Sequence, residues 1–168
     1  MRILINEKTL LIKRCIATFF ILLVSLPAFS IEEGKWALDI NLASIHQEST
    51  YDDGQKYNRK NFGLGTTYGY SDSIDFKLGF FDNSYNRTTT YLAAIWQKDF
   101  HYKALKISPG IGAFLVTGYD SAPEFAKKIQ PGAMPVLSVA YKNTALNIGL
   151  LPSAESNHAL TFQLQIGF

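Results

Sequence analysis

Apolar and polar residues alternate with a period of two along most of the chain after residue 30. The clearest instance is the final seven residues, which read Phe-Gln-Leu-Gln-Ile-Gly-Phe. Such alternation predicts a β-strand with one apolar and one polar face. A strand of this kind that ends on a terminal aromatic residue is typical of a membrane β-barrel, whose outer face meets lipid and whose inner face meets a polar lumen.

Seven further segments alternate in the same way: residues 36–42, 62–70, 74–80, 90–96, 104–119, 135–141 and 146–150. Pro109-Gly110 in the fifth of these segments indicates a bulge or kink. A total of eight strands is even, as single-chain outer-membrane barrels require, and most segments approach the ~9–11 residues of a tilted spanning strand. We therefore predict an all-β fold, an eight-stranded antiparallel up-and-down transmembrane β-barrel.

The connections between these segments alternate in length. Residues 71–73, 98–103 and 142–143 form short or modest turns. The other connections are mostly longer and polar: residues 47–60, 82–87, 120–132 and 153–158. Outer-membrane barrels have short periplasmic turns and longer outer loops. A soluble barrel of the lipocalin type is the competing fold, but the short turns and the aromatic terminus favour the membrane barrel.

The first 30 residues have a different character. Four basic residues and one acidic residue precede an apolar run from Ile16 to Val24, and Ala28 and Ser30 fit a cleavage site before Ile31. This is the pattern of a signal peptide. A transmembrane anchor is the alternative, but the run is shorter than the roughly 20 apolar residues that an anchor needs. We predict a signal peptide over residues 1–30 and a single barrel domain over residues 31–168, in the outer membrane of a Gram-negative bacterium.

The amino-acid composition argues against several classes of function. Cys15 is the only cysteine and lies in the predicted signal peptide, so the mature chain has no disulfide or thiolate metal site. Acidic and basic residues are nearly balanced after residue 30, which argues against a nucleic-acid partner. No histidine, including His101 and His158, belongs to a cluster with metal-ligand spacing. We expect a monomer without metal or cofactor.

Two outer connections carry the candidate chemistry. His46 lies at the end of the first strand, and Ser84 lies in the tight loop of residues 81–87. Hairpin topology places both at the same end of the barrel, so they could be neighbours. A histidine beside a hydroxyl is the minimal arrangement for general-base activation of an oxygen nucleophile. A solvated or capping histidine at the rim is the structural alternative.

Four segments of the chain match, in order, the motifs of a known family. They are His46-x-x-x-x-Tyr51-Asp52, Tyr57-Asn58 before Gly63-Leu64-Gly65, the loop of residues 81–87, and residues 135–141 with Pro152 downstream. Over about residues 40–168 the chain thus resembles the PagP family of outer-membrane lipid A palmitoyltransferases. The corresponding family motifs are His-x-x-x-x-Tyr-Asp, Tyr-Asn-Glu before a glycine-rich strand, Phe-Lys-Asp-Ser-Trp-Asn-Lys, and Pro-Leu-Ala-Ser-Val-Gly-Tyr.

The resemblance implies an enzyme that moves a fatty acyl chain from a phospholipid donor to lipid A. It makes His46 the general base and Ser84 a hydroxyl partner in the site. The family aspartate falls on Asn83, which can orient an imidazole but cannot stabilise its positive charge as a carboxylate does. Asp52, in the first outer loop, is a candidate substitute for that carboxylate.

The resemblance also implies routes and contacts for lipid. The barrel interior would hold one acyl chain, with its length set by the apolar lining. Pro135 at the start of the sixth strand would interrupt the ladder and mark a lateral gate, although a proline at a strand start is also common. Arg87, Lys127 and Lys128 would face lipid A phosphates, or they belong to ordinary charged loops.

A second hypothesis is a non-catalytic small barrel of the OmpA or OmpX kind, with a structural or surface-binding role. The lumen distinguishes the two hypotheses. A continuous apolar slot favours the enzyme, and a charged, hydrogen-bonded network favours the structural protein. Lipid A deacylation is a weaker third candidate, because no His-x-Ser motif lies near a strand end.

Overall fold

The computed structural model describes residues 32–48, 50, 54, 56–119, 128–152 and 158–168, so the predicted signal peptide lies outside the described residues. The strands are β1 (Trp36–His46), β2 (Gly63–Ser71), β3 (Ile74–Asp82), β4 (Thr88–Gln97), β5 (Phe100–Tyr102), β6 (Leu105–Val116), β7 (Gln130–Tyr141), β8 (Thr144–Leu151) and β9 (Ala159–Gly167). In the described part of the chain, no helix is long and apolar enough to cross a membrane.

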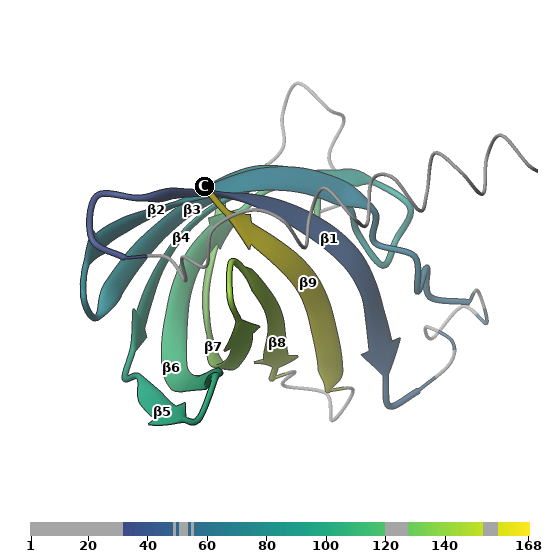
Figure 1. Cartoon of the computed structure of the whole chain (residues 1–168). Coiled ribbons are helices and arrows are strands. Elements are labelled where there is room, and N and C mark those ends of the chain that lie inside the picture. The colour runs from purple at the N-terminus through teal and green to yellow at the C-terminus, as the bar shows by residue number, and fades with distance from the viewer. Residues whose placement is uncertain (1–31, 49, 51–53, 55, 120–127, 153–157) are drawn as a thin grey trace, which may run out of the picture.

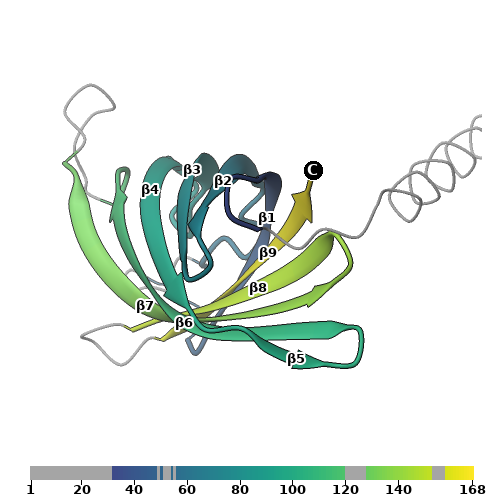
Figure 2. The same cartoon turned by 60° about the vertical axis from the view of Figure 1, so that its left-hand side comes forward.

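Eight of these strands form one closed antiparallel sheet (Figure 1). The order is β4-β3-β2-β1-β9-β8-β7-β6, and a ladder between β4 and β6 closes the circle. The first and last barrel strands pair from Ala37↔Gly167 to His46↔Ala159. This confirms the predicted eight-stranded antiparallel β-barrel. The ninth strand, β5, is a short hairpin partner of β6 that projects beyond one end of the barrel (Figure 2).

Two predicted boundaries are wrong. Residues 98–103 are not a plain turn, because they contain β5. The sixth predicted strand begins earlier than expected, at Gln130, so Pro135 lies in the middle of β7 and residues 130–132 belong to the strand rather than to the loop. Pro131 and Gly132, which read as loop residues in the sequence, both pair with β6.

The bulge predicted at Pro109-Gly110 is also wrong. The ladder between β6 and β7 runs without a register shift from Leu105↔Tyr141 to Val116↔Gln130. On its other side β6 pairs with β5 as far as Ile107 and with β4 from Gly110 onward. The Pro109 carbonyl accepts the Lys98 N–H at 3.0 Å, so the proline nitrogen faces this change of neighbour. The proline has no N–H with which to return this bond, yet the register continues unbroken on both sides of it.

The outward face of the barrel is apolar and the inward face is polar over much of its length. Exposed outward side chains include Leu38, Leu64, Leu78, Leu92, Ile111 and Leu150. Buried inward side chains include Asp39, Thr67, Asp75, Ser108 and Gln165. This is the arrangement of a membrane barrel and the reverse of a soluble one, so the lipocalin-type alternative is wrong.

The two ends of the barrel differ. One end carries the turns β2–β3, β4–β5, β5–β6 and β7–β8, together with the C-terminus (Figure 2). The other end carries the longer connections β1–β2, β3–β4, β6–β7 and β8–β9. We refer to them as the short-turn end and the loop end. In outer-membrane barrels the short turns face the periplasm.

A β-bulge in β1 decides which residues of that strand face the lumen. The register against β9 shifts between Asn41 and Ala43. Before the shift the odd-numbered Asp39 and Asn41 point inward, and after it Ser44 and His46 do so. An unbroken strand would have placed His46 on the lipid face. Bulges commonly re-aim a side chain in this way beside functional sites.

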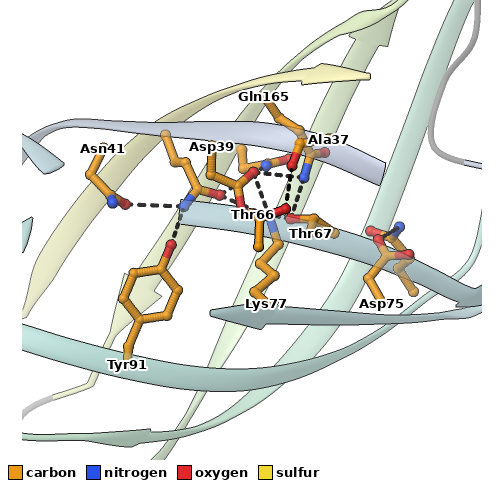
Figure 3. Close-up of polar contacts among 12 residues, drawn as sticks. Ala37, Asp39, Asn41, Thr66, Thr67, Asp75, Lys77, Tyr91 and Gln165 are labelled. Atoms are coloured by element: carbon orange, nitrogen blue, oxygen red, sulfur yellow. Dashed lines mark hydrogen bonds and ion pairs between the residues drawn. The ribbon is translucent and has the colours of Figure 1, made fainter. Parts of the chain in front are cut away.

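A polar network, formed by Asp39, Thr67, Lys77, Gln163 and Gln165, crosses the lumen (Figure 3). Thr67 and Gln165 donate to the buried Asp39 carboxylate at 2.6 and 2.9 Å. The Lys77 ammonium lies 3.5 Å from the same carboxylate and donates to Gln163 at 2.8 Å. The members come from β1, β2, β3 and β9, so this lumen network bridges the seam between the first and last strands.

Candidate active site

His46 meets two hydroxyl groups at the loop end of the lumen. Its Nε2 atom lies 2.7 Å from Ser84 Oγ and 3.1 Å from Ser44 Oγ. His46 and Ser84 are 38 positions apart in the sequence, and the structure brings them together as hairpin topology predicted. Both serines are buried while the imidazole is half-buried. This geometry allows Nε2 to exchange a proton with a hydroxyl in a site that is largely shielded from water.

Aromatic rings hold the imidazole and surround the site. The His46 ring stacks on Tyr57 with centroids 4.3 Å apart and planes 7° apart. Tyr57 in turn meets the edge of Tyr85, which meets the edge of Tyr119. Burial first, and the neighbouring Tyr85 second, raise the pKa of Tyr119, so its phenol stays neutral. The stack fixes the plane of the imidazole, which a solvated rim histidine would not require.

Asn58 joins the two loops that carry the site. Its backbone N–H donates to the Ser84 carbonyl at 2.8 Å, and its side-chain amide donates to the Asn83 carbonyl at 3.2 Å. The adjacent Tyr57 stacks on His46. The β1–β2 connection therefore holds both the base and the serine loop in place.

Asn83 is fully buried, and its amide is saturated by contacts to nearby backbone and side-chain groups. Its side-chain oxygen accepts the backbone N–H groups of Tyr85 and Arg87 at 2.9 and 3.0 Å. Its side-chain nitrogen donates to the Gly118 carbonyl at 2.7 Å and to Thr89 Oγ1 at 3.1 Å. These four bonds use the full capacity of the amide. Asn83 thus shapes the loop that presents Ser84 and does not point its amide at the imidazole.

A cavity of about 640 Å³ opens beneath His46, Ser44 and Ser84, within the range of about 300–1,000 Å³ that is usual for ligand pockets. Its apolar lining comes from Ala93, Ile95, Phe114, Val116, Met134, Val136, Leu151 and Ala159. Its polar lining includes Tyr91 and Gln163, whose side chains are hydrogen-bonded at 3.3 Å. Lys77 and Gln165 of the lumen network also line the cavity, so it is largely apolar below the site and reaches the charged network deeper in the barrel.

The barrel wall beside this cavity is incomplete between β7 and β8. β7 pairs with β6 over residues 130–141, but with β8 only from Val136 to Tyr141. Pro135 is the first β7 residue beyond the shared ladder and lacks an N–H to extend it. The structure therefore places Pro135 at the edge of a gap in the ladder, beside the cavity lined by Met134 and Val136.

Only some of the remaining predicted site residues lie in the described part of the chain. Arg87 and Lys128 are exposed at the loop end, whereas Asp52 and Lys127 lie outside the described residues. In the ranges that the structure describes, no three His, Cys, Asp or Glu side chains are grouped to hold a metal. Sequence reasoning gave Ser44 no role, although it lies two residues before His46 in the candidate segment. It also gave no role to Tyr57 or Asn58, although both belong to a recognised motif.

Two solved structures match most of this chain at low sequence identity. The N-terminal β-barrel domain of Pseudomonas aeruginosa OprF matches with 13% identity and a TM-score of 0.44, covering 81% of this chain and 98% of that chain. The Yersinia pestis outer membrane protein Ail matches with 12% identity and a TM-score of 0.42, covering 81% of this chain and 100% of that chain.

A search of curated proteins finds no significant match. The sequence model of one family matches residues 28–165, and that family is described as "Antimicrobial peptide resistance and lipid A acylation protein PagP". The match spans most of the chain and confirms the resemblance drawn from the four motifs. The chain therefore belongs to the PagP family.

Proposed function

We propose that this protein is an outer-membrane acyltransferase that moves a fatty acyl chain from a phospholipid to lipid A. The observation that carries the proposal is the contact of 2.7 Å between His46 Nε2 and Ser84 Oγ at the mouth of the apolar cavity. Family membership supports lipid A as the acceptor. A non-catalytic barrel has no need of a stacked, doubly hydrogen-bonded histidine above an apolar slot.

In the proposed reaction the acyl chain of the donor phospholipid lies in the cavity, with its ester at His46. Neutral His46 removes the proton from a lipid A hydroxyl at Nε2, and the resulting oxygen attacks the ester carbonyl. The ester C–O bond then breaks, and the proton passes from His46 to the departing lysophospholipid oxygen. Ser84 donates to Nε2 before the reaction, and once Nε2 holds the lipid proton the Ser84 hydroxyl can donate to the developing negative charge. The products are acylated lipid A and a lysophospholipid, and no cofactor takes part.

Other residues would deliver the lipids. The gap beside Pro135 is the proposed lateral entrance, because the β7–β8 ladder ends there and the neighbouring Met134 and Val136 line the cavity. Arg87, Lys127 and Lys128 are the proposed contacts for lipid A phosphates at the loop end, where cationic side chains suit phosphate oxygens. Asp52 remains a candidate partner for the imidazole.

The test is mass spectrometry of lipid A from cells that express the wild-type chain, His46→Ala or His101→Ala. His101 is exposed on β5 at the opposite end of the barrel, so its variant is the matched control. We expect lipid A to gain one acyl chain with the wild-type and His101→Ala chains and to stay unmodified with His46→Ala. Heat-dependent gel mobility verifies that each barrel is folded.

The non-catalytic barrel remains the second candidate, because the lumen network is the charged, hydrogen-bonded feature that such barrels contain. Unmodified lipid A from cells with a folded wild-type barrel in the outer membrane would favour it. In that case Asn83, in place of the family aspartate, is the first residue to examine.

A further inference from the structure

The short-turn end carries a continuous apolar face on one side of the barrel. The ladders place Tyr102 beside Leu105, and Leu105 beside Tyr141, so the three form one row across β5, β6 and β7. Their side chains are 65%, 39% and 51% exposed. A second row, Phe100 beside Ile107, continues the face toward the barrel centre. Since alternate residues of a strand share a face, both rows point outward.

Two turns at this end repeat one unusual arrangement. Lys103 and Lys142 each follow the tyrosine of that row, and each has a φ of 55°. This left-handed region is uncommon for a residue other than glycine and is favoured by asparagine. Each ammonium lies over its tyrosine ring, at 5.5 Å for Lys103 and 5.6 Å for Lys142. Lysine occupies this unfavourable backbone conformation in both turns, which indicates that its side chain has a role.

Nearby acidic side chains do not cancel the charge of this side. Lys98 adds a third ammonium, 5.7 Å from the Phe100 ring. The carboxylate of Asp99 turns to Lys106 at 2.9 Å and to Ser108 at 2.7 Å. The exposed acidic side chains of the short-turn end lie elsewhere, before β1 and in the β2–β3 turn: Glu32, Glu33 and Asp72. Lys103 in the β5–β6 turn and Lys142 in the β7–β8 turn flank the β6–β7 pair, and their backbones are roughly 10 Å apart at two strand spacings.

We propose that this hairpin surface, formed by Phe100, Tyr102, Lys103, Leu105, Tyr141 and Lys142, binds an anionic phospholipid of the phosphatidylglycerol type. The lipid belongs to the leaflet that the short turns face. The ammonium groups attract its phosphate electrostatically, the rings lie at headgroup depth, and the apolar rows contact its acyl chains. The surface is at the opposite end from His46, so the proposal stands apart from acyl transfer.

Native mass spectrometry of the full barrel in detergent tests this proposal. The probes are phosphatidylglycerol and phosphatidylcholine with identical acyl chains, added in equal amounts. We expect the wild-type barrel to retain phosphatidylglycerol severalfold better than phosphatidylcholine. The variant Lys103→Asn/Lys142→Asn loses this preference, since a lysine near an anionic lipid surface contributes roughly fivefold. Asparagine suits the backbone of both turns, so the variant keeps the fold.

The matched control is Lys56→Asn/Lys60→Asn, which removes the same charge from exposed positions in the β1–β2 connection at the loop end. We expect this control to keep the preference for phosphatidylglycerol. Equal retention of both lipids by the wild-type barrel would overturn the proposal. So would an equal loss in both double variants, because the preference would then reflect total charge and not the hairpin surface.

Discussion

The side-chain hydrogen bonds of Asn83 hold its own loop in shape and do not serve the chemistry of the neighbouring His46. An aspartate at this position could accept the two backbone N–H groups that Asn83 Oδ1 accepts. It could not donate to the Gly118 carbonyl, which lies 2.7 Å from Asn83 Nδ2. The side-chain nitrogen is therefore as important to this loop as the oxygen.

The variant Asn83→Asp, which restores the family residue, is expected to be less stable than the wild-type barrel. Its carboxylate would face a carbonyl oxygen in a buried site, a loss of about 1–3 kcal/mol. Urea unfolding of the refolded barrel, followed by tryptophan fluorescence, measures the difference. An Asn83→Asp barrel of equal stability and higher acyl transfer would instead show that this chain lacks only the carboxylate.

Ser44 is expected to position the imidazole without taking part in the reaction. Its hydroxyl is 3.1 Å from His46 Nε2, and one such hydrogen bond contributes about 0.5–1.5 kcal/mol. Ser44→Ala should therefore lower kcat by roughly twofold to tenfold with little change in KM, measured with purified barrel and dispersed lipids. Ser44→Thr keeps the hydroxyl and should restore kcat. A Ser44→Thr barrel as slow as Ser44→Ala would exclude the positioning role.

Among the elements, the two strands that border the lateral gap permit a direct test of lipid entry. Extension of the register Val136↔Gly149 by one step places Pro135 opposite Leu150. Cysteines at these two positions should form a disulfide that closes the gap. We expect acyl transfer to stop under oxidising conditions and to recover on reduction.

The matched control for this crosslink joins Val139 and Leu146, which pair within the intact part of the same ladder. A disulfide there leaves the gap open, so acyl transfer should continue. If both crosslinks are harmless, lipid enters the cavity by another route. The only native cysteine, Cys15, precedes all the strands, so the barrel itself offers no competing thiol.

The strands themselves could be predicted from the sequence, because alternation is a local property. The bulge in β1 could not be predicted, because it depends on the pairing of β1 with β9, more than a hundred residues later in the sequence. In that pairing Asn41 lies opposite Gln163 and Ala43 lies opposite Phe162. The start of β7 was missed because proline and glycine at residues 131 and 132 indicate a loop locally, whereas the ladder with β6 includes both. Within the site, hairpin topology predicted the meeting of His46 and Ser84, but the contact of Ser44 with Nε2 depends on side-chain directions after the bulge.

For the whole molecule, the division of the lumen into an apolar slot and a polar network should limit the acyl chain. Ala93 lines the slot and pairs with Lys77 of the lumen network across the ladder. Ala93→Leu should therefore shorten the transferred chain by one or more methylene groups, visible in the mass of lipid A. Ala94→Leu adds the same side chain on the lipid face and should leave the product unchanged. An unchanged chain length in both variants would place the limit elsewhere.

The lumen network also determines when the barrel can form. Gln163 and Gln165 reach Asn41 and Asp39 across 122 and 126 positions of sequence. Until β9 pairs with β1, the Asp39 carboxylate lacks the donor on Gln165, and Lys77 lacks its acceptor on Gln163. An open sheet would present these groups to the hydrocarbon, where unsatisfied polar groups are strongly disfavoured. Contacts this distant in sequence also form slowly. Insertion into the bilayer and closure of the barrel are therefore expected to occur as one late, concerted step of folding.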